Sequence, residues 1–157
     1  MMQAKQQPLQ TAFVYGLVLG VALGMSEIAL VFVLMLIPYP LAMFISRLGL
    51  VLLVLAYLYA GYQAARRTGQ VYAGTLAGAL TGAFGVATII VFTYIAAFLH
   101  VGLILNPQMF LGIPIGIVTN SALLSPLANI TLTFAFYGAI AGTLAGLVGK
   151  RRSSYGA

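Results

Sequence analysis

Glu27 is the only acidic side chain in the sequence, and it lies inside a long apolar run. Within a membrane such an acid is costly, by roughly 2.5–3.5 kcal/mol on insertion scales, and acids of this kind often mark ion or proton paths. One interpretation is therefore that Glu27 carries a proton or a cation. The other, which the sequence favours, is that Glu27 and Arg47 form a buried ion pair that orients two neighbouring helices.

The spacing of the chain brings Glu27 and Arg47 to similar depths. Residues 38–40 are Pro-Tyr-Pro, which cannot continue a helix and predict a tight turn between two apolar runs. In a hairpin closed there, Glu27 lies level with residue 51, and Arg47 lies about one helical turn further out. The long Arg47 side chain can cover that distance, or it can extend to the membrane surface instead. Glu27 follows Gly20 by seven residues, so the two share a helix face that points into the bundle.

Other chemistry-bearing residues are few. The sequence has no cysteine and one histidine, His100, which excludes a cysteine site or a site of several histidines within one chain. A single haem or chlorophyll could use His100 as its axial ligand, but an interfacial histidine more often hydrogen-bonds water or backbone. We therefore predict no cofactor and no metal site. Because no acid pair, catalytic triad or phosphate-binding loop occurs, we also predict that the protein is not an enzyme.

The composition identifies the elements that must position these residues. Of 157 residues, 62% are apolar and 5% are charged, with a net charge of +6. Soluble domains carry about 25% charged residues, and disordered chains are less hydrophobic and more charged. Both classes are excluded. The sequence predicts an all-α integral membrane protein.

Four apolar stretches are long enough to cross a bilayer, because one crossing needs about 20 residues. We predict a four-helix transmembrane bundle that forms a single domain over residues 1–157. The expected spans are residues 13–37, 41–65, 71–99 and 127–148.

The basic residues lie mainly at the ends of these spans and predict the orientation. All except Arg47 fall on one side of the expected membrane: Lys5, Arg66, Arg67, Lys150, Arg151 and Arg152. The positive-inside rule then places both termini in the cytoplasm, and we expect a bacterial inner (plasma) membrane. The residues of the two larger clusters either bind lipid headgroups or only fix the topology. They form no folded basic surface for nucleic acid.

Residues 100–126 form a segment without charge that glycines and prolines interrupt. Irregular backbone cannot face lipid, so this segment either lies in the outer interface or folds back as a re-entrant loop.

The two halves of the sequence resemble each other. A shift of 58 residues superposes three glycines, and later shifts of 85 and 86 match Arg-Arg and Pro-Leu-Ala. We interpret this as two parallel two-helix repeats, with 100–126 inserted into the second, against the alternative of chance agreement.

Glycines recur every four residues in three of the spans. Glycines at this spacing share one helix face and allow close approach of a neighbouring helix, which is a main source of association in lipid. They all fall in the expected cytoplasmic half, so we predict a bundle that is narrow there and wider outside. The second span lacks such a stripe and is expected to face lipid or a partner. The stripes are Gly16, Gly20, Gly24; Gly74, Gly78, Gly82; and Gly138, Gly142, Gly146.

Two functions follow from these features. Because packing signals outnumber candidate coupling groups, the first is a non-enzymatic accessory or structural subunit whose glycine stripes pack in a membrane complex. Its partners would be membrane lipids and either other membrane subunits or copies of itself. The alternative is a homo-oligomeric proton-coupled transporter or ion channel that uses Glu27.

Overall fold

The computed structural model describes residues 7–98 and 124–154, and within them it is entirely helical. The helices are α1 (Pro8–Met35), α2 (Tyr39–Thr68), α3 (Val71–Phe98) and α5 (Leu124–Ser154). Each contains a stretch that is long and apolar enough to cross a membrane. The prediction of a four-helix membrane bundle is therefore confirmed.

Local sequence explains where the first helices begin and end. Pro8 opens α1 at a position where its missing N–H costs nothing, and Pro38 precedes α2. Gly69 ends α2 in the left-handed conformation (φ 69°), and its N–H donates to the carbonyl of Ala65. The tight hairpin predicted at residues 38–40 is thus present, although the turn lies between Leu36 and Pro38.

The last helix is longer than expected. The prediction was 127–148, whereas α5 extends from Leu124 to Ser154 and includes Lys150 and Arg151. Arginine and lysine are good helix formers, and their charges favour the C-terminal end of a helix. The run of apolar residues predicted only the part of α5 that can lie in the hydrocarbon core of a membrane.

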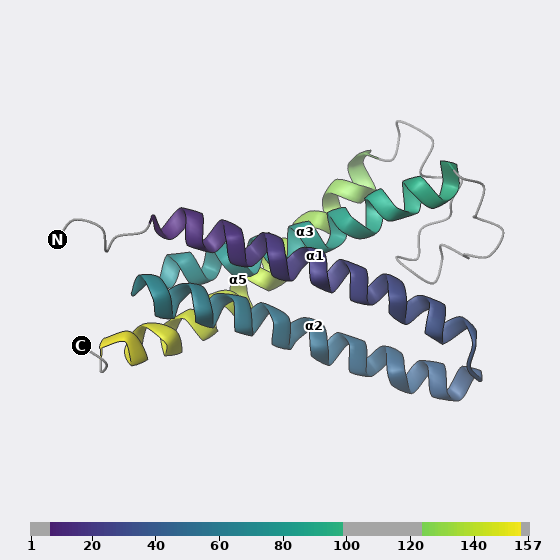
Figure 1. Ribbon diagram of the computed structural model, residues 1–157, viewed down its shortest axis with the longest axis horizontal. Helices are drawn as coiled ribbons and strands as arrows, with labels where there is room; N and C mark the ends of the chain where they lie inside the picture. The colour runs from purple at the N-terminus through teal and green to yellow at the C-terminus, as the bar shows by residue number, and fades with distance from the viewer. Residues whose placement is uncertain (1–6, 99–123, 155–157) are drawn as a thin grey trace.

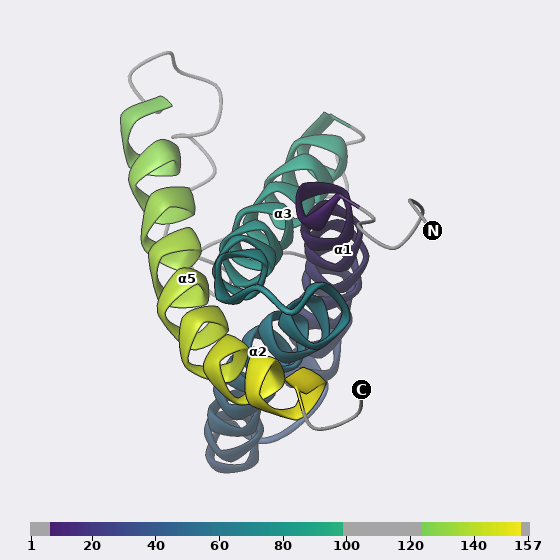
Figure 2. The ribbon, with the colours of Figure 1, turned by 90° about the vertical axis from the view of Figure 1, so that its left-hand side faces the viewer.

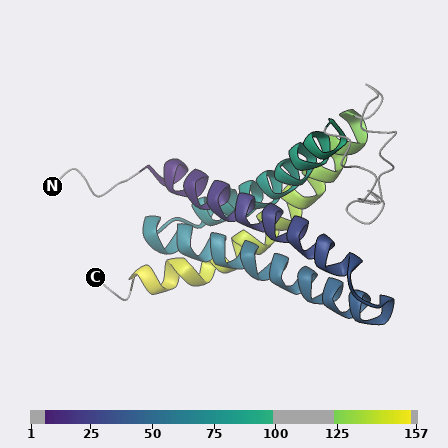
Figure 3. The same cartoon turned by 45° about the vertical axis from the view of Figure 1, so that its right-hand side comes forward.

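The helices converge at one end and diverge at the other. At one end, the C-terminal end of α2 lies between the N-terminal end of α1 and the C-terminal end of α5, whereas at the other end the hairpin between α1 and α2 diverges from the far ends of α3 and α5 (Figures 1 and 3). α3 lies between α1 and α5 and packs against all three other helices (Figure 2). We call the narrow part the terminal end and the wide part the hairpin end.

Some predictions fall outside the described residues. These are the placement of almost all of 100–126 and any role of His100. α1 and α3 run from the terminal end toward the hairpin end, and α2 and α5 run back (Figure 1), so the two-repeat interpretation stays a prediction.

Candidate functional site

The first glycine stripe brings α1 against α3. A Cβ atom added to Gly20 would lie 2.7 Å from Cβ of Phe84, and one added to Gly24 would lie 2.6 Å from Cβ of Thr88. An added Cβ on Gly16 would overlap Leu80 in the same way. Only glycine permits this approach, so the backbones of α1 and α3 come close together where the two helices cross.

The other two stripes face each other across α3 and α5. An added Cβ on Gly78 would overlap the carbonyl oxygen of Gly138, and one on Gly142 would overlap that of Gly74. Gly61 of α2 joins them, since its added Cβ would overlap the backbone of Gly142. Gly82 approaches the backbone of Phe134 in the same manner, and an added Cβ on Gly146 would lie 3.2 Å from the carbonyl oxygen of Val71. All nine glycines therefore contact helices of their own chain.

Glu27 lies one turn beyond the last glycine of the first stripe, where the two pairs of helices begin to separate. Its side chain is half-buried. The carboxylate is turned toward α2, because Oε1 lies 3.7 Å from the position that a Cβ of Gly49 would take. The same added Cβ would lie only 2.9 Å from Cδ2 of Leu30, so the missing side chain at Gly49 mainly makes room for Leu30.

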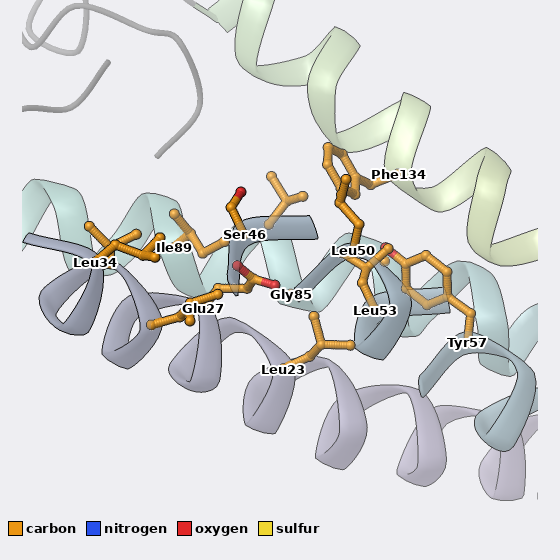
Figure 4. A pocket seen from close by; sticks show the side chains of 14 residues that line it. Leu23, Glu27, Leu34, Ser46, Leu50, Leu53, Tyr57, Gly85, Ile89 and Phe134 are labelled. Carbon is orange, nitrogen blue, oxygen red and sulfur yellow. The ribbon is translucent and has the colours of Figure 1, made fainter. Parts of the chain in front are cut away.

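The carboxylate borders a cavity of about 220 Å³ to which all four helices contribute (Figure 4). Its walls are mainly leucine, valine, isoleucine and phenylalanine side chains. The polar side chains besides Glu27 are Ser46 and Tyr57, and the hydroxyl of Tyr57 points into the cavity (Figure 4). Tyr57 is only 2% exposed. Ser46 and Leu50, also on α2, are exposed and form the rim of the cavity. The site is one acid with two hydroxyl groups in a mainly apolar pocket that is open at Ser46 and Leu50.

The predicted ion pair between Glu27 and Arg47 is absent: among the described residues no cation lies within 4.0 Å of the Glu27 carboxylate. Arg47 is exposed, and its Nη2 lies 3.9 Å from Sδ of Met43 in the preceding turn. The reason is helical phase. Gly49 faces Glu27, and Arg47 precedes it by two residues, or roughly 200° around the helix. Sequence spacing predicted correctly that the two residues lie at similar depths, but it did not predict which faces of the two helices meet.

Hydroxyl groups in the spans mostly serve their own helices. The hydroxyls of Thr81, Thr88 and Thr133 donate to carbonyl oxygens four residues earlier, as Ser and Thr commonly do in such helices. Thr75 and Thr143 also contact carbonyl oxygens of their own helices, but in addition their hydroxyl oxygens lie 2.8 Å apart and join α3 to α5. This interhelical bond lies at the terminal end, among the glycines, and forms no path to Glu27.

The basic clusters lie at the terminal end of the bundle. Arg66 and Arg67 occupy the last turn of α2, and Lys150 and Arg151 occupy the end of α5. The guanidinium carbon of Arg67 lies 5.3 Å from the ring centre of Tyr15 on α1. Among the described residues no group of three or more His, Cys, Asp or Glu side chains could hold a metal ion.

Tyr57 and Phe134 belong to the site but were not predicted. The sequence does predict that two of the lining residues share a helix face. Ser46 and Tyr57 are eleven residues apart, which is close to three full turns. Nothing in the sequence indicated that this face meets Glu27. No motif in the sequence marks Phe134.

Comparison with models of protein families, with curated proteins and with solved structures found no match to this chain. A function for this chain is therefore inferred from the geometry of its own residues.

Proposed function

We propose that the protein is a proton-coupled membrane transporter that acts as a homo-oligomer, with Glu27 as the group that binds and releases the proton. The observation that carries this proposal is the position of the carboxylate, which borders a mainly apolar pocket between the four helices and has no ion pair among the described residues.

The physical reason is the high cost of an isolated carboxylate among apolar side chains. The free energy of such a group falls when it binds a proton or a cation. The group releases this proton or cation when water reaches it. A buried ion pair with Arg47 would have satisfied the acid permanently. Since Arg47 faces the other way, the acid keeps its capacity to bind.

The shape of the bundle supports access from one side. The glycine contacts hold the backbones together at the terminal end, whereas the helix pairs separate at the hairpin end (Figure 1). Transport then requires the two pairs to change their angle about the crossing of α1 and α3. Gly20 and Gly85 lie at this crossing, and an added Cβ on Gly85 would meet only the carbonyl oxygen of Gly20, at 3.5 Å.

We also propose that both termini lie in the cytoplasm, in a bacterial inner membrane. The clusters at the ends of α2 and α5 lie at the same end of the bundle, which supports a single orientation under the positive-inside rule. The cavity would then open toward the outside.

The test is proton flux in vesicles that contain the purified full chain and a pH-sensitive dye. We expect flux for the wild type and its loss in Glu27→Gln, with the same oligomeric mass for both. Ser26→Ala is the matched control, because Ser26 is exposed and its hydroxyl donates only to the carbonyl of Leu23. Equal flux in the wild type, E27Q and vesicles without protein would refute the proposal.

The second candidate is a non-enzymatic subunit of a membrane complex. Its support is the outer half of α2, which exposes apolar side chains such as Leu48 and Leu52, at 47% and 66%. Lipid covers such a face equally well, and the glycine stripes are used within the chain, so this candidate ranks second. The native mass of protein extracted gently from its own membrane tests it, because a subunit migrates with other polypeptides.

A further inference from the structure

A second concave region lies at the terminal end, away from Glu27. It is a groove of about 330 Å³ between the start of α1 and the end of α2. Its lining residues are Gln10, Thr11, Val14, Tyr15, Val18 and Arg67.

Among the described residues, the charge of Arg67 has no acidic counterpart. Glu27 is the only acid in the sequence, and it lies twelve residues beyond Tyr15 on α1, or roughly 18 Å along the helix. The ring of Tyr15 instead holds the guanidinium at 5.3 Å, which fixes its position without neutralising it. The five N–H donors of an arginine suit phosphate oxygens. A phosphate group in the groove would therefore supply a negative charge that no described side chain supplies.

The groove changes from polar to apolar along α1. Gln10 and Thr11 lie in the first turn, beside Arg67, whereas Val14 and Val18 lie one and two turns deeper and are 51% and 59% exposed. An occupant that matches both parts has an anionic phosphate at one end and a hydrocarbon chain at the other.

We propose that this groove binds one anionic phospholipid, with its phosphate at Arg67, Gln10 and Thr11 and an acyl chain along Val14 and Val18. The lipid would tie the start of α1 to the end of α2. This proposal does not depend on proton transport.

The test is native mass spectrometry of the full chain, titrated with phosphatidylglycerol or phosphatidylcholine. We expect tighter binding of phosphatidylglycerol, and a roughly five-fold loss in Arg67→Gln, as suits about 1 kcal/mol for one charge near a membrane surface. Arg66→Gln removes the same charge from the neighbouring position, which does not line the groove, and is expected to have little effect. Equal losses in R66Q and R67Q would overturn the proposal, because they indicate diffuse attraction without a site.

A second variant tests the apolar part without changing charge. Val18→Trp fills the groove at an exposed position and is expected to lower phosphatidylglycerol binding at least as much as R67Q. Val21→Trp, at an exposed position outside the groove, is the control. Undiminished binding in V18W would refute the acyl-chain contact, and competition by free inorganic phosphate alone would show a phosphate site that needs no lipid.

Discussion

The terminal end and the hairpin end of this bundle use the same four helices in opposite ways. At the terminal end, backbones of α2, α3 and α5 touch through Gly61, Gly78, Gly138 and Gly142. At the hairpin end, aromatic side chains keep the helices apart, as in the edge-to-face pair of Phe32 and Phe92, whose ring centres are 6.4 Å apart. Where backbones touch there is no room for a ligand. The chain has its one acid just beyond the last close contact of α1, where the space opens.

The two glycine stripes that the proposed repeat superposes also differ in their surroundings. Gly20 faces α3, where an added Cβ would lie 2.7 Å from Cβ of Phe84 and 2.8 Å from the carbonyl oxygen of Thr81, whereas its counterpart Gly78 faces the backbone of Gly138 on α5. Equivalent residues therefore do not have equivalent neighbours. The first hairpin uses its glycines to contact the second, and the second uses its own to close on itself. This difference leaves the space between α1 and α2 that Glu27 occupies.

The comparison predicts its largest effects at the terminal end. Gly78→Ala puts a Cβ into the carbonyl of Gly138, and we expect it to lower the free energy of unfolding by about 1–3 kcal/mol. Gly85→Ala, seven residues along α3, is the control. Its added Cβ meets only ordinary contact, so the better helix propensity of alanine should leave stability equal or raised by up to about 1 kcal/mol. Denaturant unfolding in detergent measures both, and equal losses would contradict the packing argument.

Substitution of Glu27 should change the free energy of unfolding in the opposite direction. We expect Glu27→Leu to raise the free energy of unfolding by about 2 kcal/mol, because it removes a carboxylate from an apolar cavity. The same variant should abolish proton flux. Ser26→Leu, at the adjacent exposed position, should change stability much less. A destabilised E27L protein would show that Glu27 makes a structural contact that holds the fold together.

The sequence predicted the scaffold better than the site, and helical phase explains the difference. Apolar length and turn residues were enough to locate four helices, since Pro38 and Gly69 interrupt the chain by their own covalent geometry. The partner of Glu27 depended on how α2 is rotated about its axis. A shift of two residues, from Gly49 to Arg47, reverses the face that α2 presents. Sequence spacing fixes faces within one helix but not which faces of two helices meet.

A smaller effect is expected from the interhelical hydrogen bond at the terminal end. Thr75→Val and Thr143→Val together form a double-mutant cycle across α3 and α5, and we expect a coupling free energy of about 0.6 kcal/mol. Thr88→Val in place of T75V is the control pairing, because the hydroxyl of Thr88 bonds within α3. A coupling that is equal in both cycles would show that the close pair contributes nothing specific.

The smallest expected effect discriminates between the two interpretations of Glu27. Arg47→Gln should change the free energy of unfolding by no more than about 0.5 kcal/mol and leave proton flux intact, because Arg47 is exposed and contacts Met43 rather than the acid. If the two charges were a buried pair, removal of one partner would cost about 3–5 kcal/mol. R47Q combined with E27Q should likewise give additive changes in unfolding free energy. A large loss in R47Q that E27Q rescues would restore the ion pair and remove the basis for transport, since a permanently paired acid has no proton to exchange.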